Sequence, residues 1–209
     1  MSRVYLWMFV GLGVTGATAF ATATHEAILV PVMRSFWILL IAELGLVFAL
    51  SYLAPRLSAP VAGLLFLVYS ALNGLTLSGI FLIYRLGTIT DAFAITAGVF
   101  GAMSLYATVT QKDLSGWGTF LFIGLLGVLV AGVVNLFMRS DLMGFVISSS
   151  CVVVFAGLTA YDTQKLRRHF SAAWAGGGVG SLAIVGALTL YLDFINLFLA
   201  ILRLLDRRR

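Results

Sequence analysis

The sequence predicts an all-α membrane protein with seven transmembrane helices. Of its 209 residues, 61% are hydrophobic and only 10% are charged, whereas a soluble globular domain carries about 25% charged residues. Seven apolar stretches, each near the length of about 20 residues that crosses a bilayer, follow one another with short polar connections. Each stretch must be helical, because lipid offers no hydrogen-bond partners to a free backbone.

The first expected span covers residues 4–24 and follows Arg3. A basic residue followed by an apolar run and small residues is also typical of a cleaved signal peptide. This run is long for a signal peptide, and further membrane segments follow it, so we interpret it as a span. Residues 25–33 are expected to form a loop that ends near Pro31.

The other six spans are bounded by charged residues, prolines or glycines. They are expected at residues 35–53, 61–84, 92–110, 117–138, 142–163 and 181–205. Small residues recur four positions apart within these spans and so share one helix face, which lets helix backbones approach closely. The pairs are Gly74 and Ser78, Gly98 and Ala102, and Gly127 and Ala131. We therefore expect residues 1–209 to form one tightly packed domain.

The formal net charge of +5 comes from arginines in loops and tails. In a membrane protein such charge sets the orientation and attracts anionic lipids, so the expected partner is the lipid bilayer and not nucleic acid. Lysines and arginines divide almost evenly between the two sides of a seven-span chain, and their count does not orient it. The single cysteine, Cys151, lies in an apolar run and excludes a disulfide within the chain.

Three acidic residues lie inside the expected spans: Glu43, Asp162 and Asp193. A carboxylate near the bilayer centre costs about 2.5–3.5 kcal/mol on insertion scales, so such a residue is expected to be functional. Asp193 is about twelve residues into the last span, or roughly 18 Å along the helix axis. Asp162 closes the preceding span. The two aspartates come level if the last span begins a turn later or the sixth span continues to Arg168.

Two aspartates in contact cannot easily both ionise, so a shared proton would make Asp162 and Asp193 titrate as a unit near physiological pH. We therefore predict a proton-sensing pair. The alternative is that each aspartate is a structural hydrogen-bonding group or ends an interfacial turn. Calcium prefers about six to eight oxygen ligands. Two aspartates with a distant Glu43 are too few, so any calcium site at the pair is expected to be weak.

Other membrane activities lack the residues that they need. A retinal protein needs a lysine inside a span, but the lysines are Lys112 and Lys165, both in loops. A serine intramembrane protease needs a buried histidine, and both histidines lie in loops. An aspartyl intramembrane protease would use two aspartates on adjacent spans, but Asp193 follows Leu-Tyr-Leu instead of the Gly-x-Gly of that class. We expect no enzyme activity and no resident cofactor.

Two segments around the aspartates resemble the signature of the Bax inhibitor-1 family, the transmembrane Bax inhibitor motif proteins. They are AYDTQKL at 160–166 and GALTLYLDFINLF at 186–198. The likeness continues through YSALNGLTLS at 69–78, GVFGAMSLY at 98–106 and KDLSG at 112–116. It covers most of the chain in order, and it is greatest to the inner-membrane members from proteobacteria.

The resemblance implies a bundle in which the C-terminal helix is central and ringed by the other six. It implies that Asp162 and Asp193 are the proton sensor and that Glu43 is the family's acidic residue on the second helix. The family's arginine near the end of the last helix falls on Arg203. The arginine that latches onto the aspartate pair in some members has its nearest counterpart in Arg56, displaced by a couple of residues.

The resemblance also implies a function, a pH-sensitive calcium leak with calcium as the permeant ion and protons as the signal. It suggests the bacterial inner membrane and a cytoplasmic N-terminus. An alternative is a membrane interaction protein without transport activity, because some bacterial relatives are thought to regulate membrane proteases. Under that alternative, loop residues such as 165–169 matter and the aspartates do not.

Overall fold

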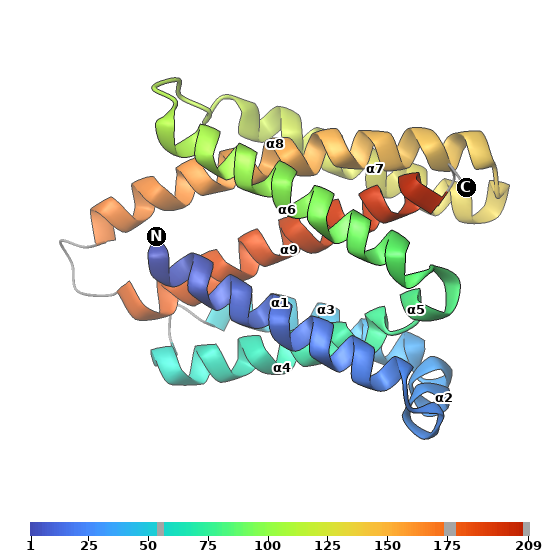
Figure 1. The fold of residues 1–209 in the computed structure, drawn as a ribbon. Coiled ribbons are helices and arrows are strands. Elements are labelled where there is room, and N and C mark those ends of the chain that lie inside the picture. The colour runs from blue at the N-terminus through green and yellow to red at the C-terminus, as the bar shows by residue number, and fades with distance from the viewer. Residues whose placement is uncertain (54–56, 174–178, 207–209) are drawn as a thin grey trace. The chain divides into compact units, whose positions relative to one another are not determined.

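The computed structural model describes residues 1–53, 57–173 and 179–206, and every regular element within these ranges is a helix (Figure 1). In chain order the helices are α1 (Ser2–Ala23), α2 (Glu26–Arg34), α3 (Phe36–Leu53), α4 (Ala59–Leu77), α5 (Ile80–Ile83), α6 (Leu86–Val109), α7 (Trp117–Met138), α8 (Asp141–Ala173) and α9 (Val179–Asp206). Among the described residues, seven stretches are long and apolar enough to cross a membrane, with α4 and α5 together forming one of them. The predicted all-α architecture with seven spans is confirmed.

The segment after α1 is the helix α2, and the prediction of a loop over residues 25–33 was wrong. His25 is the N-cap in an extended conformation. Glu26 lies in the first turn, where the helix dipole stabilises a negatively charged carboxylate. Leu29 and Val32, three positions apart, are both buried. A helix of nine residues is too short to be stable alone. The burial of this apolar face therefore outweighs the presence of Pro31.

The sixth span continues well beyond the predicted range of 142–163. Helix α8 has 33 residues and runs to Ala173, so Asp162 lies inside a helix instead of at its end. Residues 163–173 contain no glycine or proline, the residues that most often stop a helix. The sequence predicted that Asp162 and Asp193 would come level if the sixth span continued to Arg168, and α8 does continue beyond that residue.

The helices belong to two compact units. The first contains residues 1–85 and 169–191, and the second contains residues 86–168 and 192–209. Helix α9 is one uninterrupted helix whose first half belongs to the first unit and whose second half belongs to the second.

In the first unit, α1 and α3 both pack along α4. Gly74 of α4 lies at the contact with α1, where an added Cβ would be 2.6 Å from the carbonyl oxygen of Thr15. Only a residue without a side chain fits this approach. Gly98 and Gly127 differ, because an added Cβ at either position would meet nothing within 4 Å in the described part of the chain. The spacing of small residues predicted a close helix contact at all three glycines, and the described residues show it at Gly74 but not at Gly98 or Gly127.

In the second unit, glycine and aromatic contacts connect α6, α7, α8 and the end of α9. An added Cβ at Gly118 of α7 would lie 2.7 Å from the ring of Tyr161 on α8. The ring of Phe194 on α9 meets that of Phe100 on α6 edge-on, with centroids 5.5 Å apart. Such aromatic pairs add about 0.5–1.5 kcal/mol beyond the area that they bury.

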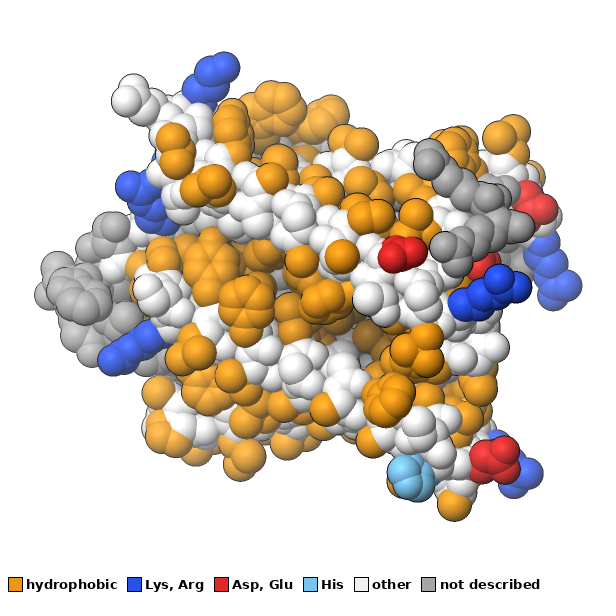
Figure 2. Space-filling view, in the orientation of Figure 1, with side chains coloured by type: hydrophobic (Ala, Val, Ile, Leu, Met, Phe, Trp, Pro, Cys, Tyr) orange, Lys and Arg blue, Asp and Glu red, His pale blue; other side chains and the backbone are white. Residues whose placement is uncertain are grey.

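Apolar side chains also cover the outside of the helices, as a lipid environment requires. In Figure 2 they line the flanks of the helices, while most lysine, arginine, aspartate and glutamate side chains lie near helix ends. The most buried span is α9, with 72% of its apolar window buried, and the least buried is α7, with 6%.

Candidate functional site

The structure brings the two predicted aspartates into contact. Asp162 of α8 and Asp193 of α9 both belong to the second unit, and their carboxyl groups lie close enough to act on each other electrostatically. An ionised carboxylate can only accept hydrogen bonds, so a bond between two carboxyl groups needs a proton on one of them. The arrangement is therefore suited to hold one proton between two aspartates.

Asp193 is the more deeply buried member of the pair. It is only 4% exposed, and its Oδ2 is buried with no hydrogen-bond partner among the described residues. A buried polar atom left unpaired costs about 1–3 kcal/mol. This oxygen is therefore a position at which a bound proton or cation would relieve an existing cost.

Asp162 has a cationic neighbour that the sequence analysis did not single out. Lys165, one turn later on α8, acts electrostatically on the Asp162 carboxyl group. Its Nζ lies 5.7 Å from the centre of the Tyr161 ring. Residues three positions apart share a helix face, so the spacing of Asp162 and Lys165 was the available signal. It was missed because residue 165 was expected to lie in a loop.

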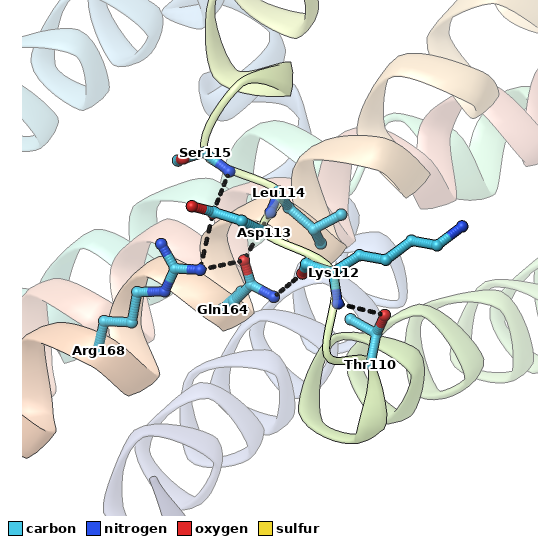
Figure 3. Close-up of polar contacts among 7 residues, drawn as sticks. All are labelled: Thr110, Lys112, Asp113, Leu114, Ser115, Gln164 and Arg168. Carbon is cyan, nitrogen blue, oxygen red and sulfur yellow. Dashed lines mark hydrogen bonds and ion pairs between the residues drawn. The ribbon is translucent and has the colours of Figure 1, made fainter.

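Beside the pair, Gln164 ties the connection between α6 and α7 to α8 (Figure 3). Its Nε2 donates to the carbonyl oxygen of Lys112 over 2.9 Å, and its Oε1 accepts from the backbone N–H of Leu114 over 2.8 Å. One turn later, Nη2 of Arg168 donates to Oδ1 of Asp113 over 2.7 Å. We call these contacts the α8 clamp. Through Gln164 the segment AYDTQKL holds the backbone of KDLSG, and Arg168 adds a contact with the side chain of Asp113.

The ion pair of the α8 clamp lies at the surface, with the Asp113 side chain 60% exposed and the Arg168 side chain 52% exposed. The hydrogen bond from Arg168, together with that from the backbone N–H of Ser115, lowers the pKa of Asp113 to about 2. Asp113 therefore stays ionised throughout the physiological range. It is not a source of pH response there.

Glu43 of α3 is a buried acid of the first unit, 7% exposed. It accepts hydrogen bonds from Oγ1 of Thr76 and, over 3.3 Å, from Nδ2 of Asn73, both on α4. Asn73 in turn accepts a hydrogen bond of 3.0 Å from the hydroxyl of Tyr191 on α9. Oγ1 of Thr15 on α1 lies 2.7 Å from the same hydroxyl. Side chains of α1, α3, α4 and α9 thus form one chain of hydrogen bonds, which we call the Glu43 network.

The Glu43 network has a direction that is set by the amide of Asn73. Because its NH₂ group faces Glu43, its carbonyl oxygen faces Tyr191, whose hydroxyl donates to it. The carboxylate of Glu43 and the phenol proton of Tyr191 therefore favour the same orientation of the Asn73 amide. The sequence identified Glu43 but not its partners. Asn73 and Thr76 were detectable in principle, because they lie three positions apart on one helix face.

Arg203 lies apart from the aspartate pair. It is exposed near the end of α9, ten residues beyond Asp193, which is about 15 Å along the helix axis. Within the described ranges it makes no ion pair with an acidic side chain. Arg56 lies outside the described residues. A role for either arginine as a charge partner of the pair stays a prediction.

A metal ion would find few ligands at the aspartate pair. No group of three His, Cys, Asp or Glu residues that could hold a metal occurs in the described part of the chain. Calcium takes about six to eight oxygen ligands, and the pair supplies two carboxyl groups. This donor set suits a weak, transient contact with a hard cation better than tight binding.

Comparison with known proteins gives matches over the whole chain. A family model described as "Inhibitor of apoptosis-promoting Bax1" matches residues 1–209. Inner membrane protein YbhL of Escherichia coli K12 is 47% identical over 214 residues, covering 100% of this chain and 92% of the relative. An uncharacterized protein of Deinococcus radiodurans is 46% identical over 208 residues, with 100% and 90% covered. An uncharacterized membrane protein of Streptococcus pyogenes serotype M1 is 46% identical over 168 residues, with 80% and 72% covered.

Proposed function

The chain belongs to the Bax inhibitor-1 family, and from this premise we propose that it is a pH-sensitive calcium leak channel. It is a membrane protein with seven apolar helices suited to a lipid bilayer, and its Escherichia coli relative is named an inner membrane protein. The proposed gate is the pair of Asp162 and Asp193. Calcium is the proposed permeant ion, and no resident cofactor is needed.

The observation that carries the proposal is the contact between two carboxyl groups within the membrane-spanning helices. The carboxyl groups of Asp162 and Asp193 act on each other electrostatically, and a hydrogen bond between them would need a proton on one of them. The second oxygen of Asp193 is buried without a partner in the described part of the protein. A structural role alone does not explain why two acids, and not an acid and an amide, meet at this position.

Loss of the shared proton would separate the helices that the pair connects. Two unit charges 4 Å apart repel by about 4 kcal/mol at an effective dielectric constant of about 20. The deprotonated pair would therefore bias a two-state bundle toward a form in which α8 and α9 lie further apart at this level. Because the contact requires the proton, we expect the calcium flux to rise as the pH rises.

Calcium flux into liposomes that contain the purified protein, measured between about pH 5 and pH 8, tests this proposal. Asp193→Asn keeps the shape of the side chain but cannot ionise, so it should abolish the pH dependence. Asp141→Asn is the matched control, because it removes an exposed carboxylate of the same unit at the first turn of α8, far along this helix from Asp162; its flux should follow the wild-type pH profile. Equal and pH-independent flux from the wild type and Asp193→Asn would refute the gate.

A second candidate function is that of a membrane interaction protein that regulates membrane proteases or other membrane proteins. The exposure of α7 favours this second candidate. Only 6% of the apolar window of α7 is buried, so this helix offers an apolar face to a partner. If this candidate is correct, the wild type gives no calcium flux, and an Asp162→Asn/Asp193→Asn double variant binds its partner as well as the wild type does. Loss of binding in that variant, with its fold retained, would count against this candidate.

A further inference from the structure

Glu43 is a buried acid near the middle of a membrane span, and the proposed gate makes no use of it. It lies seven residues after the first residue of α3 and ten before the last, or about 10 Å and 15 Å along the helix axis. Only two of the 18 residues of α3 are buried, Glu43 and Leu50. Half of the small buried face of this helix is therefore an acid, and its protonation state matters for how α3 is held.

No positive charge balances Glu43 among the residues that the structure describes. No lysine, arginine or histidine there forms an ion pair with it. The titratable groups on which its charge acts are Tyr69 of α4 and Tyr191 of α9, and a phenol is neutral or negative but never positive. From α1 the network adds only the hydroxyl of Thr15. A buried carboxyl group without a cation is expected to be neutral, because an ionised carboxylate loses its hydration on burial.

The contacts of Thr76 with two oxygen atoms also favour a proton on Glu43. Oγ1 of Thr76 contacts Oε1 of Glu43 and lies 3.3 Å from the carbonyl oxygen of Leu72. A hydroxyl has one proton to donate, so only one of these two oxygens receives it when Glu43 is ionised. A neutral Glu43 donates its own proton to Oγ1 of Thr76, and the hydroxyl of Thr76 then donates to Leu72. The neutral acid therefore makes both contacts hydrogen bonds.

The second oxygen of Glu43 is compatible with the neutral form. Nδ2 of Asn73 donates to Oε2 over 3.3 Å, and the carbonyl oxygen of a neutral carboxyl group accepts such a bond as a carboxylate oxygen does. The Asn73 amide therefore keeps its orientation, and its carbonyl oxygen still accepts from the hydroxyl of Tyr191. A proton on Glu43 leaves the rest of the Glu43 network unchanged.

We propose that Glu43 is a proton-binding site, occupied throughout the range of about pH 5–8, at which the neutral acid donates a hydrogen bond that joins α3 to α4. In this state Glu43 is a hydrogen-bond donor and not the partner of a charged group. Its proton is its own, whereas the proposed gate shares one proton between Asp162 and Asp193. The site therefore does not depend on the pair or on the proposed leak activity.

The chain contains only two glutamates, Glu26 and Glu43, so the proton can be observed directly. The full-length protein, made by cell-free synthesis with glutamate that carries ¹³C at the side-chain carboxyl, gives two NMR signals in detergent micelles. A glutamate peptide with the same label gives the reference positions of the acid and the carboxylate. Glu43→Gln assigns the signals, and Glu26→Gln, which removes the exposed glutamate of α2, is the matched control. If Glu43→Gln does not fold, the signal that remains in Glu26→Gln is that of Glu43.

We expect the Glu43 signal at the position of the neutral acid at every pH from about 5 to 8, in the wild type and in Glu26→Gln. The signal should be the same in an Asp162→Asn/Asp193→Asn double variant, in which the aspartate pair cannot ionise. A Glu43 signal at the carboxylate position anywhere in this range would overturn the occupied site. A signal that changed in the double variant would overturn its independence from the pair. Neither result depends on calcium flux, so a failure of this proposal is distinct from a failure of the gate.

Discussion

At the scale of single residues, the hydroxyl of Tyr191 is the group on which the Glu43 network depends. Tyr191 is fully buried, and its oxygen contacts both Asn73 and Thr15. Tyr191→Phe would leave the carbonyl oxygen of Asn73 without its donor. Because polar groups unpaired in such a site cost about 1–2 kcal/mol, we expect a lower melting temperature in detergent.

The matched control for this substitution is Tyr52→Phe. Tyr52 is 81% exposed, so the loss of its hydroxyl should leave the melting temperature unchanged. A Tyr191→Phe variant that melts with the wild type would mean that the network contributes no net stability. A second variant, Asn73→Leu, would then be expected to be equally stable.

The α8 clamp gives a prediction with a defined pH range. The hydrogen bonds from Arg168 and Ser115 lower the pKa of Asp113 from its usual value of 3.8 to about 2, so the folded state favours the ionised form. A lowered pKa contributes stability that is complete above the unfolded value and is lost as the pH falls toward the folded value. The contribution of Asp113 should therefore be constant above about pH 5 and decline between pH 3.8 and about 2.

Amide hydrogen exchange of residues 112–116 is a suitable measurement, because the clamp holds the backbone of this connection. Asp113→Asn should speed exchange in this segment by a similar factor at every pH from about 5 to 8. If the ratio of the exchange rates of the variant and the wild type fell toward one between pH 8 and pH 5, the ion pair of Asp113 and Arg168 would already be weakening in that range. This result would contradict the lowered pKa of Asp113.

Which residues carry charge inside the membrane was predictable from the sequence, but their hydrogen-bond partners were not. Glu43, Asp162 and Asp193 stand out because ionisable residues are rare in apolar spans. Their partners are ordinary polar residues, such as Asn73 and Tyr191, which are frequent in membrane helices. The spacing along one helix does not specify which helix packs against it, so contacts between α4 and α9 required the structure.

At the scale of helices, Gly74 tests how closely α1 and α4 must approach. Its Cβ would meet the backbone oxygen of Thr15 at 2.6 Å, and a backbone atom cannot move aside as a flexible side chain can. Gly74→Ala should therefore destabilise the protein by about 1–3 kcal/mol, the usual cost of overpacking. Thermal unfolding in detergent measures this loss.

Gly127→Ala is the matched control within α7. An added Cβ there meets nothing within 4 Å in the described part of the protein, and alanine is a better helix former than glycine by about 1 kcal/mol. The control should thus melt at the wild-type temperature or slightly above it. If Gly74→Ala melts with Gly127→Ala, the approach of α1 to α4 is not limited by this glycine.

The positions of the spans were predictable, because each is the longest apolar run in its part of the sequence. The errors lie where tertiary contacts decide the helix boundary. Helix α2 forms because Leu29 and Val32 are buried, and α8 continues past Asp162 because Gln164 and Arg168 are held by the α8 clamp. Hydropathy cannot detect either cause, since the first segment is short and the second is polar.

At the scale of the whole molecule, seven helices long and apolar enough to cross a membrane predict that the two ends of the chain lie on opposite sides of it. The orientation itself is open, because the basic residues at the end of α8 and those after Asp206 lie on opposite sides and favour opposite orientations.

We expect the N-terminus to be cytoplasmic, and fusions to reporter proteins test this orientation. Four spans precede residue 113, so a green fluorescent protein inserted there should fluoresce. All seven spans precede Asp206, so alkaline phosphatase fused after it should be active, because its disulfides form only outside the cytoplasm. The opposite result at both positions would invert the orientation. If both positions lay on the same side of the membrane, the number of spans between them would be even, which would contradict the three spans of α7, α8 and α9.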